Sequence, residues 1–289
     1  MDLLRAYIAL MKLRVVELLI ISTIPAMILA EKGVPSFGLL IATLIGGTLA
    51  AGSANAFNMV LESDLDKLME RTSARPLVTG ALSKVHATIF ATLIGTLSLT
   101  IFWIYTEPLA TILTAVAITF YVIVYTMALK RNTSQNIIWG GAAGCMPVFI
   151  GWAAVTNSLS WAAVAFFFVI FFWTPPHFWS LAIKYKDDYE AAKVPMLPVI
   201  AARNIVVRNM WFHTVAMIIS SVALIYLTDL QWWAMVATVA LGLVFALQLV
   251  QLKENSENYN TVALKIFHWS ITYLTLFSAL LVIAQLLKA

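Results

Sequence analysis

Charged residues are scarce in this chain of 289 residues: Asp, Glu, Lys and Arg together make up 11%, whereas hydrophobic residues make up 62%. A soluble domain is nearer a quarter charged. The mean hydropathy is +0.90. These values exclude an ordinary soluble protein and indicate a polytopic membrane protein. The chain has one cysteine, Cys145, so no disulfide can form within it.

Apolar segments long enough to cross a membrane recur along the whole chain. Each is close to the ~20 residues that a helix needs to cross about 30 Å of hydrocarbon. The expected spans are 15–30, 37–57, 85–105, 108–128, 137–156, 160–181, 210–228, 232–251 and 266–287. The sequence therefore predicts an all-α, polytopic membrane protein with about nine transmembrane helices around a central cavity that opens to the cytoplasmic side. Residues 1–289 are expected to form a single intramembrane domain.

Basic residues are distributed unevenly between the two sides that nine spans would create. Of the 18 Lys and Arg residues, only Lys32 and Lys288 fall on one side, which leaves 16 on the other. By the positive-inside rule this asymmetry predicts a multi-pass protein of the cell (inner) membrane with a cytoplasmic N-terminus and an external C-terminus. It also accounts for the net charge of +4. The bilayer is thus an expected partner, and nucleic acid is not.

Polar residues gather in the first long inner loop, 59–84, and at the helix end that precedes it. Asn58, Glu62 and Asp66 are spaced i, i+4 and i+8, which places them on one face if the helix continues. Such oxygen ligands suit Mg²⁺, and Arg71 and Arg75 nearby are suited to binding phosphate. The alternative is a solvated loop whose acids and bases pair with one another.

The second long inner loop, 182–209, follows an aromatic stretch that ends in Pro175-Pro176-His177. The two prolines are expected to kink or break the sixth span and to bring His177 to the mouth of a cavity. His177, Lys184 and Asp188 are spaced to share one helical face. Alternatively, the prolines only bend the helix and His177 is an interfacial histidine. Gly140, Gly141 and Gly144 are expected to permit close helix packing, not phosphate binding.

Both loops belong to the predicted cytoplasmic side, so their polar groups are expected to form one site. Paired acidic motifs around Mg²⁺ provide what ionising a diphosphate ester requires, because the metal neutralises the leaving diphosphate. A dry apolar cavity would then shelter an allylic cation from water. The sequence alone thus predicts a metal-dependent active site at one mouth of the bundle.

These motifs resemble the UbiA superfamily of intramembrane prenyltransferases, whose first motif is Asn-x-x-x-Asp-x-x-x-Asp. Asn58, Glu62 and Asp66 fit it with Glu in place of the first Asp, and Lys184 and Asp188 match the second motif, commonly Asp-x-x-x-Asp. Longer matches, from about residue 7 to 210, resemble the heme O synthase (protoheme IX farnesyltransferase) branch. They are Asp64-Leu-Asp66, Met69-Glu70-Arg71-Thr72, Arg75-Pro76, Tyr125, Leu129-Lys130-Arg131, Asn136, Trp173-Thr174-Pro175-Pro176-His177-Phe178-Trp179, Asp188-Tyr189 and Val194-Pro195-Met196-Leu197-Pro198. The branch's Lys-Pro-Arg stands here as Lys12-Leu13-Arg14.

The resemblance implies transfer of a farnesyl group from farnesyl diphosphate to a vinyl group of heme B, with addition of water, to give heme O and diphosphate. The expected catalytic residues are Asn58, Glu62, Asp66, Lys184 and Asp188, with Glu62, Asp66 and Asp188 binding Mg²⁺. The residues expected to bind diphosphate are Arg71, Arg75, Lys130, Arg131 and Lys184, and those expected to contact heme are Trp173, His177 and Tyr189. Heme A synthase or terminal oxidase assembly is a further expected partner.

Three other functions stay open from the sequence. A UbiA-type enzyme acting on a quinone precursor or another acceptor would share both motifs. A membrane transporter would also carry polar groups among its helices, although these are expected near the bilayer midplane and not at one mouth. A heme-binding subunit without activity would explain the histidines and leave the paired acids unexplained.

Overall fold

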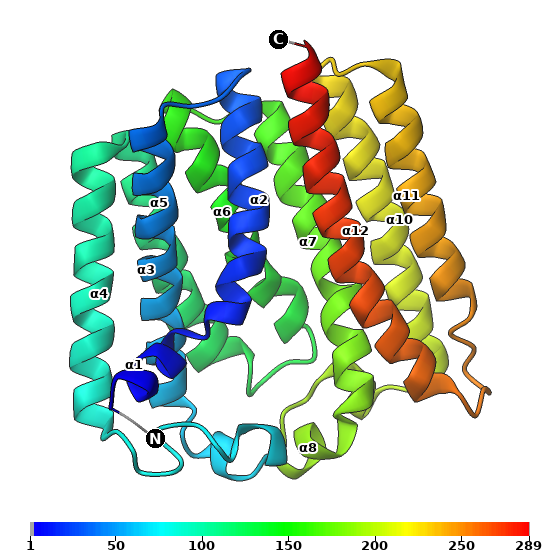
Figure 1. The fold of residues 1–289 in the computed structure, drawn as a ribbon. Helices are drawn as coiled ribbons and strands as arrows, with labels where there is room; N and C mark the ends of the chain where they lie inside the picture. The colour runs from blue at the N-terminus through cyan, green and yellow to red at the C-terminus, as the bar shows by residue number, and fades with distance from the viewer. Residues whose placement is uncertain (1–2, 289) are drawn as a thin grey trace.

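Long helices that run side by side form the whole fold, and their ends meet two opposite surfaces (Figure 1). The structure, a computed structural model, describes residues 3–288, apart from the side chains of Arg14, Val15 and Leu18. The long helices are α2 (Leu13–Glu31), α3 (Phe37–Leu61), α4 (Lys84–Tyr105), α5 (Pro108–Thr119) with its π-helical continuation η3 (Phe120–Leu129), α6 (Asn136–Thr156), α7 (Trp161–Lys184), α10 (Arg203–Leu227), α11 (Trp232–Val250) and α12 (Tyr259–Lys288). The short elements are α1 (Leu3–Met11), η1 (Leu65–Lys67), η2 (Glu70–Thr72), α8 (Lys186–Ala191) and α9 (Leu197–Ile200).

The nine predicted transmembrane helices are confirmed. In the described part of the chain, 8 helices are long and apolar enough to span a membrane, and α2 contributes a shorter apolar stretch, Leu19–Glu31. The predicted starts at 210 and 266 lie inside α10 and α12, which begin at Arg203 and Tyr259. Polar and basic residues in the first two turns of these helices resemble loop residues in a hydropathy profile, although both segments are helical.

Small residues bring α3 and α4 together along their length. A Cβ at Gly46 would overlap the ring of Phe102. The Ser98 hydroxyl donates to the Gly46 carbonyl at 2.7 Å, and the Ser53 hydroxyl donates to the Ala91 carbonyl at 2.8 Å. Within a membrane such close approach and interhelical hydrogen bonding replace the hydrophobic effect as the source of association. This pair forms one edge of the bundle, at the left of Figure 1.

Helix α7 lies at the centre of the other half, in contact with α6, α10 and α12. It passes through Pro175 and Pro176 without a break and ends only at Lys184. Both prolines are buried, and the carbonyl of Pro176 accepts a hydrogen bond from the Ser180 hydroxyl at 2.7 Å. Neighbouring helices and side-chain donors of this kind allow proline inside a transmembrane helix. The alternative that the prolines break the sixth span is therefore wrong.

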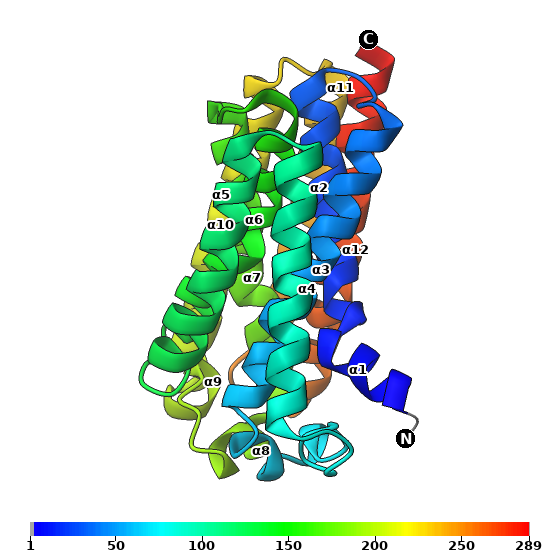
Figure 2. The ribbon, with the colours of Figure 1, turned by 90° about the vertical axis from the view of Figure 1, so that its left-hand side faces the viewer.

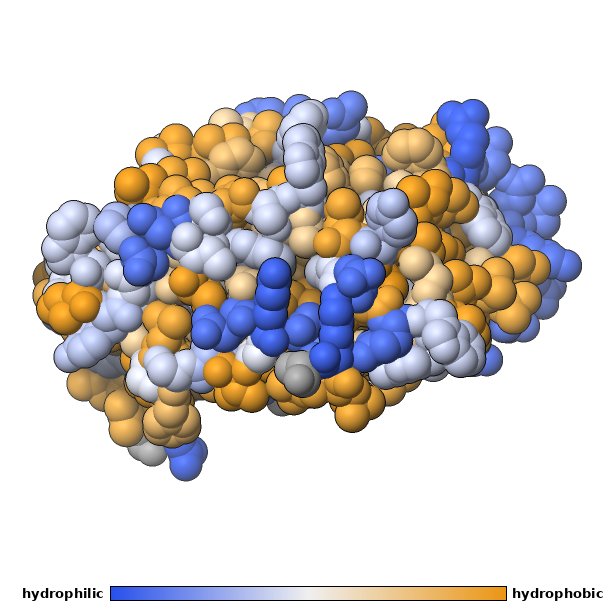
Figure 3. Space-filling model, turned by 90° about the horizontal axis from the view of Figure 1, so that it is seen from above, coloured by the Kyte–Doolittle hydropathy of each residue, from blue (hydrophilic) through white to orange (hydrophobic). Residues whose placement is uncertain are grey.

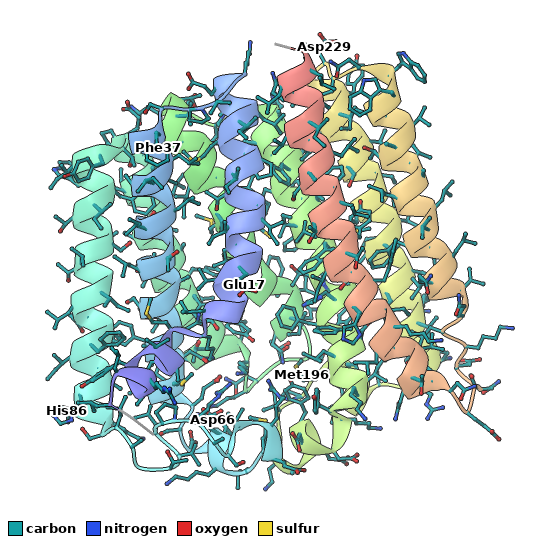
Figure 4. All side chains as sticks on the ribbon, in the orientation of Figure 1. Glu17, Phe37, Asp66, His86, Met196 and Asp229 are labelled. Carbon is teal, nitrogen blue, oxygen red and sulfur yellow. The ribbon has the colours of Figure 1, made fainter. Side chains whose placement is uncertain are left out.

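The polar connections gather at one end of the bundle. Asp66 and Met196, from the two long loops, lie at this end, and Asp229 lies at the opposite end beside the C-terminus (Figure 4). Helix α1 also lies at the polar end, and Figure 2 shows it projecting from the side of the bundle. The end that holds both loops is called the polar end below. It is the end at which the sequence predicts the active site.

Candidate active site

Asn58, Glu62 and Asp66 lie together at the polar end, although not on one continuous helix. Helix α3 ends at Leu61, Glu62 is its C-cap, and Asp66 belongs to the 3₁₀ turn η1. The amide of Glu62 still donates to the Asn58 carbonyl, and the amide of Asp66 donates to the Glu62 carbonyl, both at 2.9 Å. Each of the three residues is 1% exposed. The single helical face was a wrong prediction, but hydrogen bonds of i to i+4 spacing keep the three residues adjacent.

Each buried acid of this group is paired with a base. Lys130 donates to one carboxylate oxygen of Glu62 at 2.5 Å, and an Arg75 nitrogen contacts both oxygens of Asp66 at 2.6 Å. The bases are largely buried as well, with side chains 17% and 20% exposed. Removing one partner of a buried pair leaves an uncompensated charge and destabilises a protein strongly. The second oxygen of Glu62, Oε1, is buried and has no hydrogen-bond partner among the described residues.

Asp64 and Arg131 form a different kind of pair. Two guanidinium nitrogens donate to the two Asp64 oxygens at 2.9 Å, and one of them also donates to the Leu61 carbonyl at 3.0 Å. The Asp64 side chain is 60% exposed. Its hydrogen bonds with Arg131 hold the pKa of Asp64 below its ordinary value. Solvent screens such a pair, so it contributes at most about 1 kcal/mol to stability. Asp64 therefore lies outside the buried group.

Lys12 enters the site without having been predicted there. It lies between α1 and α2 in a left-handed conformation, with φ of 50°. Its ammonium donates to the Asn58 amide oxygen at 2.8 Å, and the Asn58 nitrogen donates to Thr126 at 3.2 Å. Burial, followed by the neighbouring Arg75 and Lys130, lowers the pKa of Lys12 to about 7. The only signal in the sequence was its place in the Lys12-Leu13-Arg14 match; the side chain of Arg14 lies outside the described part of the structure.

Arg71 joins the first loop to the second. Its backbone amide donates to an Asp188 oxygen at 3.3 Å, and its guanidinium donates to the Tyr189 hydroxyl at 3.3 Å. The same guanidinium lies over the rings of Tyr185 and Tyr189, with 5.6 and 5.7 Å to the ring centroids. Cations are attracted to the faces of aromatic rings. The structure thus brings the two predicted halves of the site together through one arginine.

Lys184 is not part of this junction. It is exposed, and among the described residues it makes no hydrogen bond or ion pair. The predicted common helical face of His177, Lys184 and Asp188 is wrong, because α7 ends at Lys184 and α8 starts a new helix at Lys186. Tyr185 separates them with φ of −106° and ψ of 32°. Of the second motif, only Asp188 approaches the first loop.

His177 is buried inside the bundle and not placed at its mouth. It is 3% exposed, and its Nδ1 lies 2.7 Å from the Ser270 hydroxyl of α12. Its ring stacks between Trp173 and Phe267, with centroid distances of 4.3 and 4.7 Å. Trp173 donates to the Ser270 carbonyl at 2.8 Å. The continuous course of α7 explains this placement, because residue 177 stays two turns inside the helix end.

The π-helix η3 adds two tyrosines that spacing alone did not select. The ring centroids of Tyr121 and Tyr125 lie 5.3 Å apart, and the Lys130 ammonium lies 6.0 Å from the centroid of the Tyr125 ring. A Cβ at Gly140 of α6 would overlap that ring. π-Helical turns are rare and occur frequently at functional sites. The close packing predicted for Gly140 is confirmed, and its consequence is room for Tyr125 beside the buried acids.

A family model described as the UbiA prenyltransferase family matches residues 19–271. The chain belongs to this family. It is 48% identical over 275 residues to a protein of Paenarthrobacter aurescens (strain TC1) named protoheme IX farnesyltransferase, with 94% of this chain and 86% of that protein covered. A protein of the same name from Renibacterium salmoninarum is 50% identical over 275 residues with the same coverage.

Solved structures of UbiA proteins share the fold of this family member. A structure of digeranylgeranylglyceryl phosphate synthase superposes with a TM-score of 0.80 at 14% identity and covers 99% of both chains. A UbiA homolog from Archaeoglobus fulgidus bound to GPP and Mg²⁺ gives a TM-score of 0.67 at 16% identity and covers 96% of this chain and 99% of that one. The predicted all-α fold is therefore confirmed.

The residues of this UbiA protein fit a magnesium ion only in part. In the described residues no three acidic, histidine or cysteine side chains are grouped closely enough to hold a metal, so Glu62, Asp66 and Asp188 do not form a complete site. Mg²⁺, however, is usually held by one or two carboxylates together with substrate phosphates and water. Glu62 has the unpartnered oxygen Oε1, and Asp66 lies beside it. These two carboxylates fit such a shared site.

Proposed function

We propose that this UbiA protein transfers a farnesyl group from farnesyl diphosphate to a vinyl group of heme B, with addition of water, to give heme O and diphosphate. The observation that carries this proposal is the meeting of two buried acids, their paired bases and Asp188 at one end of the bundle. The relatives' shared name, over 94% of this chain, supports heme as the acceptor.

Binding of the diphosphate would rest on the basic residues of the polar end. Lys130 and Arg75 are paired with Glu62 and Asp66. Lys12, between α1 and α2, contacts Asn58, and Arg71 of the first loop contacts Asp188 and Tyr189. Arg131 and Lys184 are proposed at the rim, where solvent weakens their contribution. Glu62 and Asp66 would hold Mg²⁺ together with the diphosphate, and the ion, when bound, would supply neutralisation of the leaving diphosphate.

The transfer itself needs a cation kept away from water. The carbon–oxygen bond of farnesyl diphosphate breaks, diphosphate keeps the electron pair, and the vinyl group attacks the allylic cation. Water then adds to the resulting cation and loses a proton. The rings of Tyr121 and Tyr125 lie next to the buried acids and could stabilise positive charge by their faces. Trp173, His177 and Tyr189 are our proposed contacts for the porphyrin.

The membrane orientation is part of the proposal. The N-terminus and both long loops share one end of the bundle, and the C-terminus lies at the other (Figure 1). Sixteen of 18 basic residues belong to the N-terminal side by the sequence prediction. We therefore place the N-terminus and active site on the cytoplasmic side, the C-terminus outside, and the whole chain as one domain. Heme A synthase or terminal oxidase assembly would receive the product.

The acceptor can be tested by competition in membranes that contain the chain. Membranes are incubated with Mg²⁺, farnesyl diphosphate and either heme B or an aromatic-acid quinone precursor, and products are separated by chromatography with mass detection. We expect heme O and no prenylated acid. Prenylation of the acid alone would keep the UbiA chemistry and overturn heme as the acceptor. Equimolar geranyl diphosphate, added beside farnesyl diphosphate, tests whether the farnesyl chain is preferred.

A further inference from the structure

A cavity lies at the end of the bundle opposite the acids, beside the C-terminus. Its volume is about 710 Å³, within the range of roughly 300–1,000 Å³ that small-molecule sites occupy. It lies between the ends of α2, α7, α10 and α12, and its lining includes Leu29, Lys32, Trp152, Asp229, Gln285 and Lys288. The transfer reaction uses none of these residues. The cavity is therefore a separate feature of the molecule.

The charged groups of this cavity leave one positive charge uncompensated. The Lys288 ammonium donates to a carboxylate oxygen of Asp229 at 3.1 Å and to the Thr228 carbonyl at 3.2 Å. The Lys32 side chain is exposed and has no partner among the described residues. Lys32 also occupies the left-handed C-cap of α2, with φ of 58°, a conformation that glycine adopts more easily. The unpaired cation of the cavity is thus Lys32, which stands at a left-handed position that disfavours lysine.

A buried side-chain amide forms a hydrogen bond with the backbone of this lysine. Gln285 of α12 is 5% exposed, and its side-chain nitrogen donates to the Lys32 carbonyl at 3.2 Å. The first turn of α7, at Trp161 and Ala162, also lines the cavity. A helix N-terminus carries partial positive charge and backbone donors that favour anions. The lysine and the helix end together favour a negatively charged ligand, and the Gln285 amide holds the backbone of the lysine in place.

The surroundings of the cavity are those of the membrane–water boundary. Trp161, Tyr226 and Trp232 at this end are 77–78% exposed, and such exposed aromatic residues mark the headgroup level of a bilayer. Leu29, Trp152 and Leu227 add apolar lining. Seen from this end, hydrophilic side chains gather near the centre of the surface with hydrophobic ones around them (Figure 3). A ligand here must combine an anionic group with an apolar part.

We propose that this cavity binds the phosphate of an anionic phospholipid head group from the leaflet opposite the active site. Lys32 pairs with the phosphate, and the acyl chains leave over the apolar and aromatic residues into the bilayer. An anionic head group is favoured over a zwitterionic one because the site offers a net positive charge without a matching carboxylate for a choline or ethanolamine group. Among the described residues of the lining, the one acidic side chain is that of Asp229, which is already bonded to Lys288.

The full-length chain, purified in detergent and stripped of lipid, tests this proposal by native mass spectrometry. Phosphatidylglycerol and phosphatidylcholine with identical acyl chains are added in equal amounts, and the fraction of protein carrying each is measured. We expect phosphatidylglycerol to be retained preferentially, and Lys32→Gln to lower its retention about fivefold, the effect expected of one basic residue near an anionic head group. Lys32→Arg should retain it.

The matched control is Lys265→Gln, which removes an exposed lysine from the other end of helix α12. It should bind phosphatidylglycerol like the unchanged chain. Equal retention of both lipids, or equal loss in the Lys32 and Lys265 variants, would overturn the proposal. Competition by inorganic phosphate that displaces the lipid at millimolar concentration would also overturn it, since the site would then recognise free phosphate without the acyl chains.

Discussion

The two loops of the polar end differ in how far their acids are prepared for chemistry. In the first loop, Glu62 and Asp66 are 1% exposed and each contacts a basic side chain at 2.5–2.6 Å. In the second loop, Asp188 is only partly buried and accepts one longer bond, at 3.3 Å, from the Arg71 amide. The first loop is preorganised by buried ion pairs, whereas the second is held by one arginine. The reaction should therefore respond very differently to changes in the two loops.

The largest effect is expected in the first loop. Glu62→Gln removes the negative charge that Lys130 and the proposed metal require, so heme O formation should fall by about 10³-fold or more. The measurement is the initial rate of heme O formation in membranes with equal amounts of each variant. Glu70→Gln makes the same chemical change at an exposed acid of the same loop and should leave the rate close to that of the unchanged chain. Equal rates for both variants would show that Glu62 is only structural.

The link between the loops should be the next most sensitive feature. Arg71→Ala removes the bond to Tyr189 and the contacts with two tyrosine rings, and we expect a loss of about 10- to 100-fold in rate. Arg71→Lys keeps the charge but not the planar fork, so it should recover only part of this loss. Lys67→Ala, at an exposed base of the first loop, is the control. A Lys67 variant as slow as the Arg71 variant would argue for a general charge effect.

A glycine of α6 tests the tyrosines of η3. A side chain at Gly140 would overlap the ring of Tyr125, so Gly140→Ala should displace this ring from the buried acids and slow the reaction about tenfold. Gly144 lies one turn further along the same helix, and a methyl group there would meet no atom within 4 Å, so Gly144→Ala should be neutral. A neutral Gly140 variant with unchanged melting temperature would show that Tyr125 does not contribute.

The last variant, at His177, is expected to change the stability of the protein and to leave the heme spectrum unchanged. Its ring is stacked on both sides and bonded to Ser270, so His177→Ala should lower stability by roughly 2–4 kcal/mol. The Soret band of bound heme should stay in place, because the ring is already bonded to Ser270 and stacked between Trp173 and Phe267, so the proposed contact with the porphyrin does not include its iron. Thermal unfolding and absorption spectra of the purified variant measure both quantities. A shifted Soret band would instead assign His177 to the heme iron.

The helices and the acids of the first loop could be predicted from the sequence, whereas Lys12 and the tyrosines of η3 could not, and each outcome has a physical reason. Hydropathy predicts the nine helices because each must bury its own backbone polar groups in hydrocarbon, which leaves a strong signal along the chain. The acids of the first loop were found because a carboxylate next to a membrane span is conspicuous. Lys12 was missed as a site residue because its contact with Asn58 spans 46 positions of sequence. Tyr121 was missed, and Tyr125 entered only through the family match, because aromatic residues in a membrane helix are usual and a π-helix has no distinct pattern.

The two errors about shared helical faces have one cause. Extrapolating i, i+4 spacing assumes that a helix continues, yet α3 ends at Leu61 and α7 ends at Lys184. The residues of the first motif are adjacent all the same, because backbone hydrogen bonds of i to i+4 spacing continue beyond Leu61. The residues of the second motif are separated, because the chain changes direction at Tyr185 and Lys184 lies at the surface. The outward position of Lys184 and the inward position of His177 could not be inferred without the ends of α7.

The central claim is that the buried acids of the first loop drive loss of diphosphate and that heme B receives the prenyl group. The most direct measurement is the amount of diphosphate and of heme O formed by the purified chain in liposomes with heme B, farnesyl diphosphate and Mg²⁺. We predict equal molar amounts of the two products, and neither above background with Glu62→Gln. Diphosphate release without heme O, or undiminished heme O formation by the Glu62 variant, would contradict this account.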